Sequence, residues 1–212
     1  MPHVVLLGDS IFDNAAYVGG GPDVVTQLRE RLPDGWRATL RAVDGAVTGS
    51  VRSQLDGLPP DASHLVVSVG GNDALCHAYL LDQGASSVAE AVGRLADAHE
   101  AFARDYRAML EGVLGRGLPT AVCTIYDGRF PDPHRQRLTV TALSILNDVI
   151  TRAAFAHGLP LLDLRLICGE DADYANPIEP SVQGGGKIAA AIAAALLAEP
   201  PSRLPRSVVF AR

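Results

Sequence analysis

Three polar segments of the chain carry residue types that can do chemistry. They are Gly8-Asp9-Ser10, Gly45 within a second short loop, and Gly70-Gly71-Asn72-Asp73. A serine hydroxyl can act as a nucleophile once a neighbouring base removes its proton. The N–H of a glycine and the amide of an asparagine can donate hydrogen bonds to an oxygen that becomes negative in the reaction. These residue types together suit acyl transfer.

Two of these segments also have a simpler interpretation when each is taken alone. Gly-Asp-Ser can be an ordinary strand-to-helix turn in which the serine caps the helix. Gly-Gly-Asn-Asp can likewise be a plain turn. The combination is more specific, because both segments directly follow apolar runs and a glycine-bearing loop lies between them.

The surrounding sequence alternates between short apolar runs and helical patterns. Strands are predicted at Val4–Leu7, Trp36–Val43, Leu65–Val69, Thr120–Ile125 and Leu159–Leu164. Helices are predicted at Pro22–Leu32, Ser87–Arg116, Arg135–His157 and Lys187–Leu197. This alternation predicts an α/β fold: a three-layer α/β/α sandwich around a five-stranded parallel sheet in the order 2-1-3-4-5. Ligands bind at the carboxyl ends of such strands, where all three polar segments lie.

The domain prediction is a single domain over residues 1–199, followed by a C-terminal tail over residues 200–212. The helix at Ser87–Arg116 begins with a capping box and carries an apolar stripe from Val88 through His99 to Val113. We expect this stripe to be a core face, with a dimer seam as the alternative. The chain is therefore expected to be a monomer or a homodimer.

In their order and at these strand ends, the polar segments resemble the motifs of the SGNH hydrolases, also called the GDSL family of esterases and lipases. The resemblance runs from Gly8 to the last helix and implies the flavodoxin-like SGNH hydrolase fold and hydrolysis of a small acyl ester. It also implies that Ser10 is the nucleophile. The backbone N–H groups of Ser10 and Gly45 and the side chain of Asn72 would form the oxyanion hole. Asp9 is interpreted as a supporting residue that braces the turn.

The last motif of the family is different in this chain. The family has Asp-x-x-His followed by proline, whereas this sequence has Glu179 at the histidine position and Asn176 at the aspartate position. Pro180 and Gly184 still fit the pattern. No histidine follows His157, so a shifted alignment cannot supply one.

Three interpretations of the missing histidine stay open. Glu179 can be the base if burial raises its pKa, and a neutral Asn176 beside it would not repel its charge. Alternatively, His77 or His134 can supply an imidazole from another loop at the same sheet edge. As a third possibility, the chain has lost hydrolysis and kept a ligand-binding pocket. Transfer of the acyl group to an acceptor other than water also stays open. The first interpretation is preferred.

Composition and charge bear on the partners, the location and the cofactors of the protein. The formal net charge of the 212 residues is −6, and the arginines are scattered, so no nucleic-acid partner is expected. No uninterrupted apolar run is long enough to span a membrane, and no membrane partner is expected. Three separated cysteines, Cys76, Cys123 and Cys168, favour a cytoplasmic location, and no cofactor or metal site is expected. Substrate selection is assigned to the loops Asp13–Gly21, Cys76–Gly84 and Tyr126–Pro133.

Overall fold

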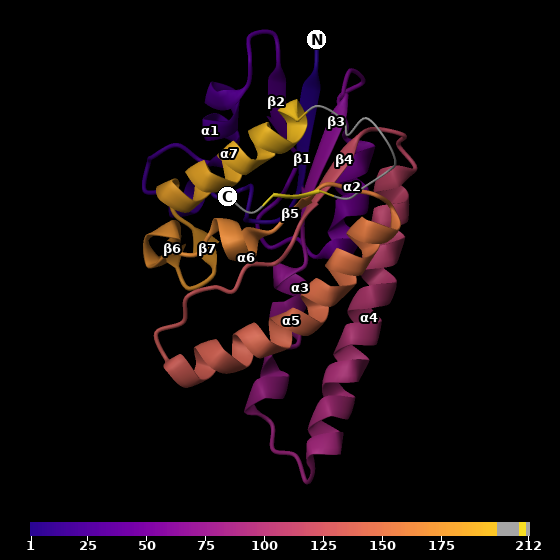
Figure 1. The fold of residues 1–212 in the computed structure, drawn as a ribbon, viewed down its shortest axis with the longest axis vertical. Coiled ribbons are helices and arrows are strands. Elements are labelled where there is room, and N and C mark those ends of the chain that lie inside the picture. Colours follow the sequence, from indigo (N-terminus) through magenta and orange to yellow (C-terminus); the bar gives the residue numbers. More distant parts are fainter. Residues whose placement is uncertain (199–207, 211–212) are drawn as a thin grey trace.

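The computed structural model describes residues 1–198 and 208–210 of the chain. Its centre is a sheet of six parallel strands in the order β2-β1-β3-β4-β5-β8 (Figure 1). The strands are β1 (His3–Gly8), β2 (Arg37–Leu40), β3 (His64–Ser68), β4 (Thr120–Cys123), β5 (Leu161–Leu162) and β8 (Val209–Phe210). A separate antiparallel hairpin consists of β6 (Tyr174–Asn176) and β7 (Glu179–Pro180).

Helices cover both faces of the sheet and make the three layers that the sequence predicts. One face packs against α1 (Val24–Arg31), α6 (Leu164–Ile167) and α7 (Val182–Leu197). The other face packs against α2 (Val51–Asp56), α4 (Val88–Leu114) and α5 (Pro133–Ala156). The shorter helices are α3 (Gly71–Cys76) and the 3-10 turns η1 (Ala15–Tyr17), η2 (Thr48–Ser50), η3 (Ala78–Asp82) and η4 (Asp171–Asp173).

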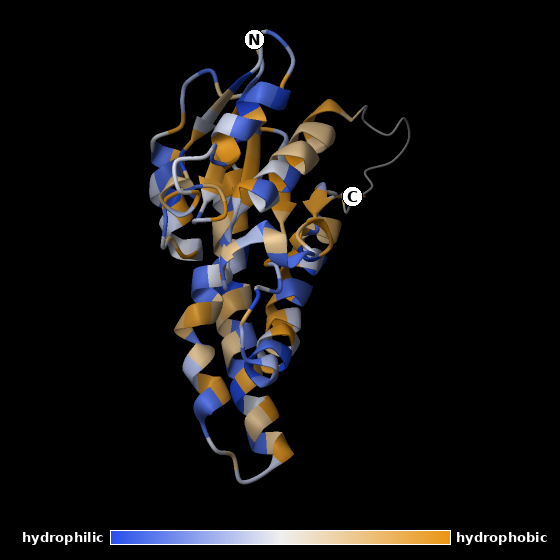
Figure 2. Ribbon diagram, turned by 90° about the vertical axis from the view of Figure 1, so that its left-hand side faces the viewer, coloured by the Kyte–Doolittle hydropathy of each residue, from blue (hydrophilic) through white to orange (hydrophobic). Residues whose placement is uncertain are grey.

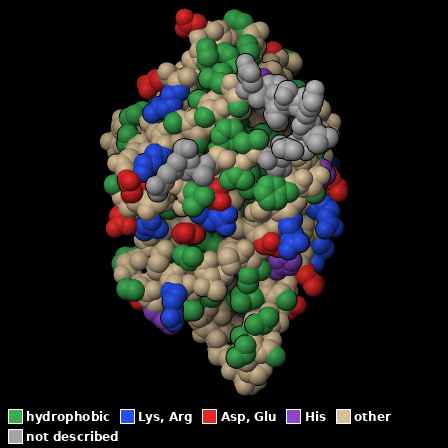
Figure 3. Space-filling view, in the orientation of Figure 1, with side chains coloured by type: hydrophobic (Ala, Val, Ile, Leu, Met, Phe, Trp, Pro, Cys, Tyr) green, Lys and Arg blue, Asp and Glu red, His purple; other side chains and the backbone are tan. Residues whose placement is uncertain are grey.

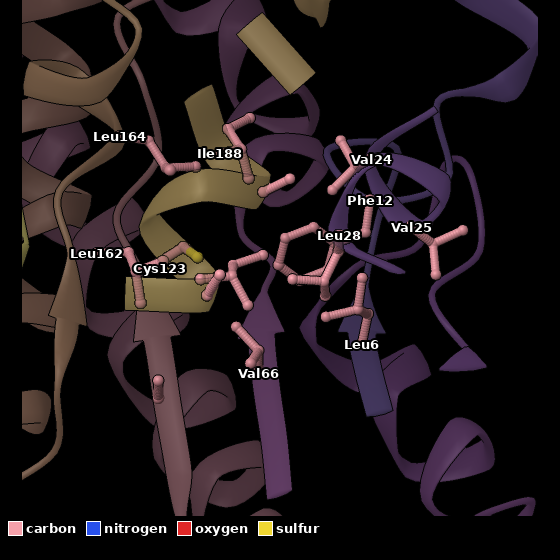
Figure 4. Packing of buried hydrophobic residues seen from close by; sticks show 14 of the residues in the cluster. Leu6, Phe12, Val24, Val25, Leu28, Val66, Cys123, Leu162, Leu164 and Ile188 are labelled. Atoms are coloured by element: carbon pink, nitrogen blue, oxygen red, sulfur yellow. The ribbon is translucent and has the colours of Figure 1, made fainter. Parts of the chain in front are cut away.

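The strand residues serve both layers because successive side chains of a strand point to opposite faces. In β1, Val4 and Leu6 lie in the cluster under α1 and α7, whereas Val5 and Leu7 lie in the cluster under α4 and α5. Figure 4 shows Leu6 within the first cluster, close to Phe12. Figure 2 shows the strands as an apolar band at the centre of the fold. A continuous apolar run is therefore what a strand covered on both faces requires.

The strand number predicted from the sequence is wrong, although the first five strands follow the predicted order. The sixth strand, β8, lies in the segment predicted as a tail, where Val209 and Phe210 pair with β5. β5 itself has two residues instead of the predicted six, because the Asp163 side chain caps α6 by accepting a hydrogen bond from the Arg165 N–H. Strands this short leave no readable alternation in a sequence.

The start of the last helix is also wrong in the prediction. α7 begins at Val182 and runs through three consecutive glycines, instead of starting at Lys187. A Cβ at Gly184 would lie 2.1 Å from the backbone oxygen of Asp173. Glycine is a poor helix former, but here the close approach of η4 leaves no room for a larger residue. Packing therefore overrides helix propensity.

The apolar stripe of the long helix is a core face only in its second half. Phe102 and Val113 are buried against the sheet, whereas Val88 and Val92 are exposed. The first turns of α4 extend past the end of the sheet, together with η3 and the first turns of α5 (Figure 1). The core prediction for the start of the stripe is therefore wrong.

The long helix α5 bears on the membrane prediction. By length and composition alone, Pro133–Ala156 is apolar enough to cross a membrane. This is weak support for a membrane segment, because α5 packs along α4 and the sheet and contributes Leu146 and Ile150 to the core. The expectation that the chain has no membrane partner stays a prediction.

Candidate active site

The turn after β1 presents Ser10 at the carboxyl edge of the sheet. Gly8 ends the strand with a φ of 127°, and a Cβ there would lie 1.7 Å from the backbone oxygen of Ser68. Only glycine allows β1 and β3 to come this close at that point. The Asp9 N–H then donates to the same Ser68 oxygen at 3.0 Å. Ser10 does not directly precede an α-helix, unlike the strand-to-helix turn considered for Gly-Asp-Ser, since α1 begins only at Val24.

Ser10 meets Glu179 at this edge. The Ser10 hydroxyl donates a hydrogen bond to Glu179 Oε1 at 3.1 Å. The two side chains come from opposite ends of the chain, and both are buried. The second carboxylate oxygen of Glu179, Oε2, is buried without a hydrogen-bond partner in the structure. The contact has the direction that proton transfer from a serine to a carboxylate needs.

Two residues of the segment after β4 hold the hairpin turn in front of Glu179. The Tyr126 hydroxyl donates to the backbone oxygen of Ile178 at 2.5 Å. The backbone N–H of Arg129 donates to the oxygen of Pro177 at 2.8 Å. The backbone entering Glu179 is therefore fixed by the neighbouring loop. The sequence prediction placed Tyr126 only in a substrate loop, because nothing in the sequence signals this contact.

Asn14 holds the other side of Glu179. Its Nδ2 donates to the backbone oxygen of Pro180 at 3.2 Å, and its Oδ1 accepts from the Val24 N–H at 3.0 Å. Asn14 is fully buried, so each of these polar contacts matters for the fold. One amide thus ties the hairpin to the loop that follows Ser10.

Asn176 takes a different position from the one expected. It pairs with Glu179 in the backbone ladder of the hairpin. Its side chain is exposed, however, and its Oδ1 accepts from the Ile178 N–H at 3.0 Å. An asparagine readily caps its own turn in this way. Asn176 therefore shapes the turn in front of Glu179, and its amide is not a side-chain partner of the carboxylate.

Burial changes the acidity of two carboxyl groups at the site. Burial, aided by the negative charge of Asp44, raises the pKa of Glu179 to about 7 against the opposing effect of the Ser10 hydrogen bond. Burial also raises the pKa of Asp9 to about 8, with the charge of Glu179 acting in the same direction. Asp9 accepts a hydrogen bond from the Ile11 N–H at 3.1 Å, within the turn that follows β1. Near neutral pH, Glu179 can exchange a proton more readily than an ordinary carboxylate can.

The Gly45 loop lies next to Asn72. Asn72 Nδ2 donates to the backbone oxygen of Ala46 at 3.0 Å, and an amide nitrogen has a second N–H for another acceptor. Gly45 is exposed and has a φ of 77°, which favours glycine. The carboxylate of Asp73 anchors the loop by accepting from Thr48 Oγ1 at 2.6 Å. These contacts bring two of the predicted oxyanion-hole segments side by side.

A cavity of about 160 Å³ opens at Ser10. Asn72, Glu179 and His77 line it as well, whereas Gly45 is not among its lining residues. His134, the other alternative base, lies exposed in the first turn of α5, outside this lining. Within residues 1–198 and 208–210, no three His, Cys, Asp or Glu side chains gather where they could hold a metal ion.

Comparison with known proteins adds to this geometry. Residues 6–184 match the model of the GDSL-like lipase/acylhydrolase family. No curated protein sequence matches the chain.

Among solved structures, the chain resembles a lipase from the goat rumen metagenome, with 18% identity, a TM-score of 0.69, and coverage of 92% of this chain and 97% of that one. It also resembles an extracellular lipase from Streptomyces rimosus, with 18% identity, a TM-score of 0.63, and coverage of 88% and 96%. An acetyl xylan esterase gives 18% identity, a TM-score of 0.63, and coverage of 89% and 96%. At this identity the likeness shows a shared fold.

Proposed function

Because this chain belongs to the GDSL-like lipase/acylhydrolase family and is an ester-hydrolysing enzyme, we propose that Ser10 is its nucleophile and Glu179 its base. The observation that carries the proposal is the 3.1 Å hydrogen bond from the Ser10 hydroxyl to Glu179. The raised pKa of Glu179, about 7, supports it, because a base works best when its pKa lies near the operating pH.

In the first half of the reaction, Ser10 Oγ attacks the carbonyl carbon of the ester and its proton passes to Glu179. The carbonyl oxygen becomes negative and accepts hydrogen bonds from the N–H groups of Ser10 and Gly45 and from the Asn72 amide. When the carbon–oxygen bond of the ester breaks, the protonated Glu179 returns the proton to the leaving alcohol. The acyl group then remains bonded to Ser10.

In the second half, a water replaces the alcohol. The oxygen of this water attacks the acyl carbon while Glu179 takes one of its protons. Glu179 then returns the proton to Ser10 Oγ when the carboxylic acid leaves. The unpartnered Oε2 of Glu179 can accept a hydrogen bond from the attacking water while Oε1 stays near Ser10.

The test is a set of single variants assayed on p-nitrophenyl esters. Glu179→Gln keeps the size of the side chain and removes the base, so we expect kcat to fall by ~10²–10⁴-fold. Ser10→Ala should abolish turnover to a similar or greater degree. His77→Ala and His134→Ala, which remove the alternative bases, should cost far less. A Glu179→Gln enzyme with normal turnover would exclude Glu179 as the base.

The pH profile gives an independent check. The carboxylate form of Glu179 is the base, and its pKa is about 7. Below pH 7 the group is protonated, so kcat/KM should fall about tenfold for each pH unit and level off above pH 8. An activity limit near pH 4, the ordinary range of an exposed glutamate, would contradict a buried base. A wild-type protein without turnover on any ester would favour the ligand-binding alternative.

A further inference from the structure

The cavity at Ser10 continues beyond the sheet edge into the surrounding helices. Its walls there are formed by η3, α4 and α5, and their side chains are mostly hydrocarbon. The wall residues that matter below are Leu80, Leu81, Leu95, Ala142 and Leu143. We call this part of the cavity the apolar chamber. Such walls offer water few hydrogen bonds, whereas a hydrocarbon chain lowers its free energy when it leaves water and lies against them.

Small residues leave the chamber open between the two long helices. α4 and α5 pack against each other, and Ala98 of α4 and Ala142 of α5 both line the cavity. An alanine side chain ends at Cβ, so a larger residue at either position would occupy space that is now free. These two positions can therefore set the depth of the chamber.

The length of the chamber follows from α5. The residues of α5 that line the cavity run from Arg135 to Leu146. At a rise of 1.5 Å per residue they span roughly 16 Å of the helix. An extended chain advances about 1.2 Å per bond, the value that an extended polypeptide gives. The wall can thus follow an extended hydrocarbon of about 13 bonds, or roughly 14 carbons.

The charges of the lining restrict the occupant further. Asp9 and Glu179 lie at the nucleophile. Arg135 is the lining's one lysine or arginine among the described residues, and it pairs with Asp82 of η3 at 2.9 Å. A carboxylate on the acyl chain of the ester would therefore find no unpaired lysine or arginine among these lining residues. Figure 3 shows hydrophobic side chains at this end of the molecule, where η3 and the first turns of α4 lie in Figure 1.

On the basis of the proposed function, we propose that the apolar chamber binds the acyl chain of the ester. The substrate class is then esters of neutral, unbranched acyl groups of up to roughly 14 carbons. The alcohol part leaves by the other side of Ser10 and is not selected by the chamber. Ala142 of α5 and Leu81 of η3, which both line the cavity, are specificity-determining residues for chain length.

The first test is a series of p-nitrophenyl esters from acetate to dodecanoate with the wild-type enzyme. Each buried methylene should raise kcat/KM by up to about fourfold until the chamber is full. We expect decanoate to be cleaved at least a hundredfold faster than acetate at equal low concentration. A kcat/KM that is flat or falls with chain length would overturn the proposal, even though hydrolysis itself would still support Ser10 as nucleophile.

The second test fills the chamber. Ala142→Phe should lower the decanoate-to-acetate ratio of kcat/KM by tenfold or more. Ser144→Phe is the matched control, because Ser144 is exposed on the same helix and does not line the cavity. Leu81→Phe makes the same test from η3 if Ala142→Phe does not fold. An equal ratio in filled and control variants would overturn the chamber as the acyl site.

A third measurement separates this proposal from the catalytic one. 2-Dodecanone has a carbonyl and a ten-carbon chain but no leaving group, so it can bind without turnover. Ser10→Ala protein should bind it at least tenfold more tightly than 2-butanone, and Ala142→Phe should remove the difference. This result would support the chamber even if no ester were hydrolysed, and equal binding of both ketones would refute it.

Discussion

The carboxyl edge of the sheet and the helices beyond it form the two ends of one cavity, and they are built differently. At the sheet edge, hydrogen bonds fix the position of each reacting group. Ser10 contacts Glu179, Tyr126 holds the turn before Glu179, and Asn14 holds the residue after it. At the helical end, the walls are mostly hydrocarbon. The ion pair between Arg135 of the lining and Asp82 is largely exposed, and such pairs contribute little to stability.

We infer from this difference that the sheet edge carries out the reaction and the helical end selects the substrate. Bond breaking needs groups held to within a fraction of an ångström, which a network of buried hydrogen bonds provides. Holding a hydrocarbon chain needs only space of the right size, which apolar walls provide without directional contacts. Substitutions at the sheet edge should therefore reduce the rate for every ester. Substitutions at the helical end should change which ester is preferred.

Among the further variants that compare the two ends, Asn72→Ala at the sheet edge should have the largest effect. Loss of its N–H from the oxyanion hole should lower kcat by ~10²–10³-fold for short and long esters alike. Steady-state kinetics on acetate and decanoate esters would measure this. A loss confined to one chain length would show that Asn72 acts in acyl-chain binding instead of in the reaction. It would contradict the division of roles between the two ends.

Two leucines on α4 allow the contribution of each end to the free energy of unfolding to be compared. Leu110 is buried in the core, and Leu95 lines the cavity on the same helix. Leu110→Ala should reduce the free energy of unfolding by about 2–5 kcal/mol, because it creates a void that the core cannot close. Leu95→Ala enlarges a space that is already open and should cost less than half as much. Urea unfolding of both variants is the measurement, and equal losses would show that the helical end is packed like the core.

A smaller effect is expected from Tyr126→Phe. This change removes one hydrogen bond to Ile178 and should cost about 1 kcal/mol, or roughly a fivefold loss in kcat, because Glu179 loses part of its support. KM should change little, since Tyr126 acts by positioning the base. Tyr79→Phe is the control, because Tyr79 is exposed on η3 and does not line the cavity. A rise in KM without a change in kcat would place Tyr126 in substrate binding instead.

The two ends also differ in how far the sequence predicts them. The substrate loops were expected at residues 13–21, 76–84 and 126–133, and the second and third do contribute to the cavity. Residues 13–21 do not line it, and α4 and α5 supply walls that no loop prediction included. Helix residues such as Ala98 and Ala142 give no signal in a sequence, because an alanine at a cavity and an alanine on a surface look the same.

The sequence by itself determines the sheet and the order of the polar segments along its edge. Apolar runs such as Val4–Leu7 must be buried on both faces, and parallel strands must expose their following loops at one edge. That reasoning gives the α/β/α fold and the first five strands in order. The resemblance to the SGNH hydrolase motifs adds Ser10, Asn72 and Glu179 as candidates for one site.

The tertiary structure alone decides the chemistry available to those residues. Glu179 has an ordinary pKa in an unfolded chain, and only burial at the end of β7 raises it to about 7. Its contact with Ser10, its support by Tyr126 and the helical course of Gly184 all depend on segments far apart in the chain. Local sequence patterns carry propensity and periodicity, whereas these features arise from distances that exist only once the layers have packed.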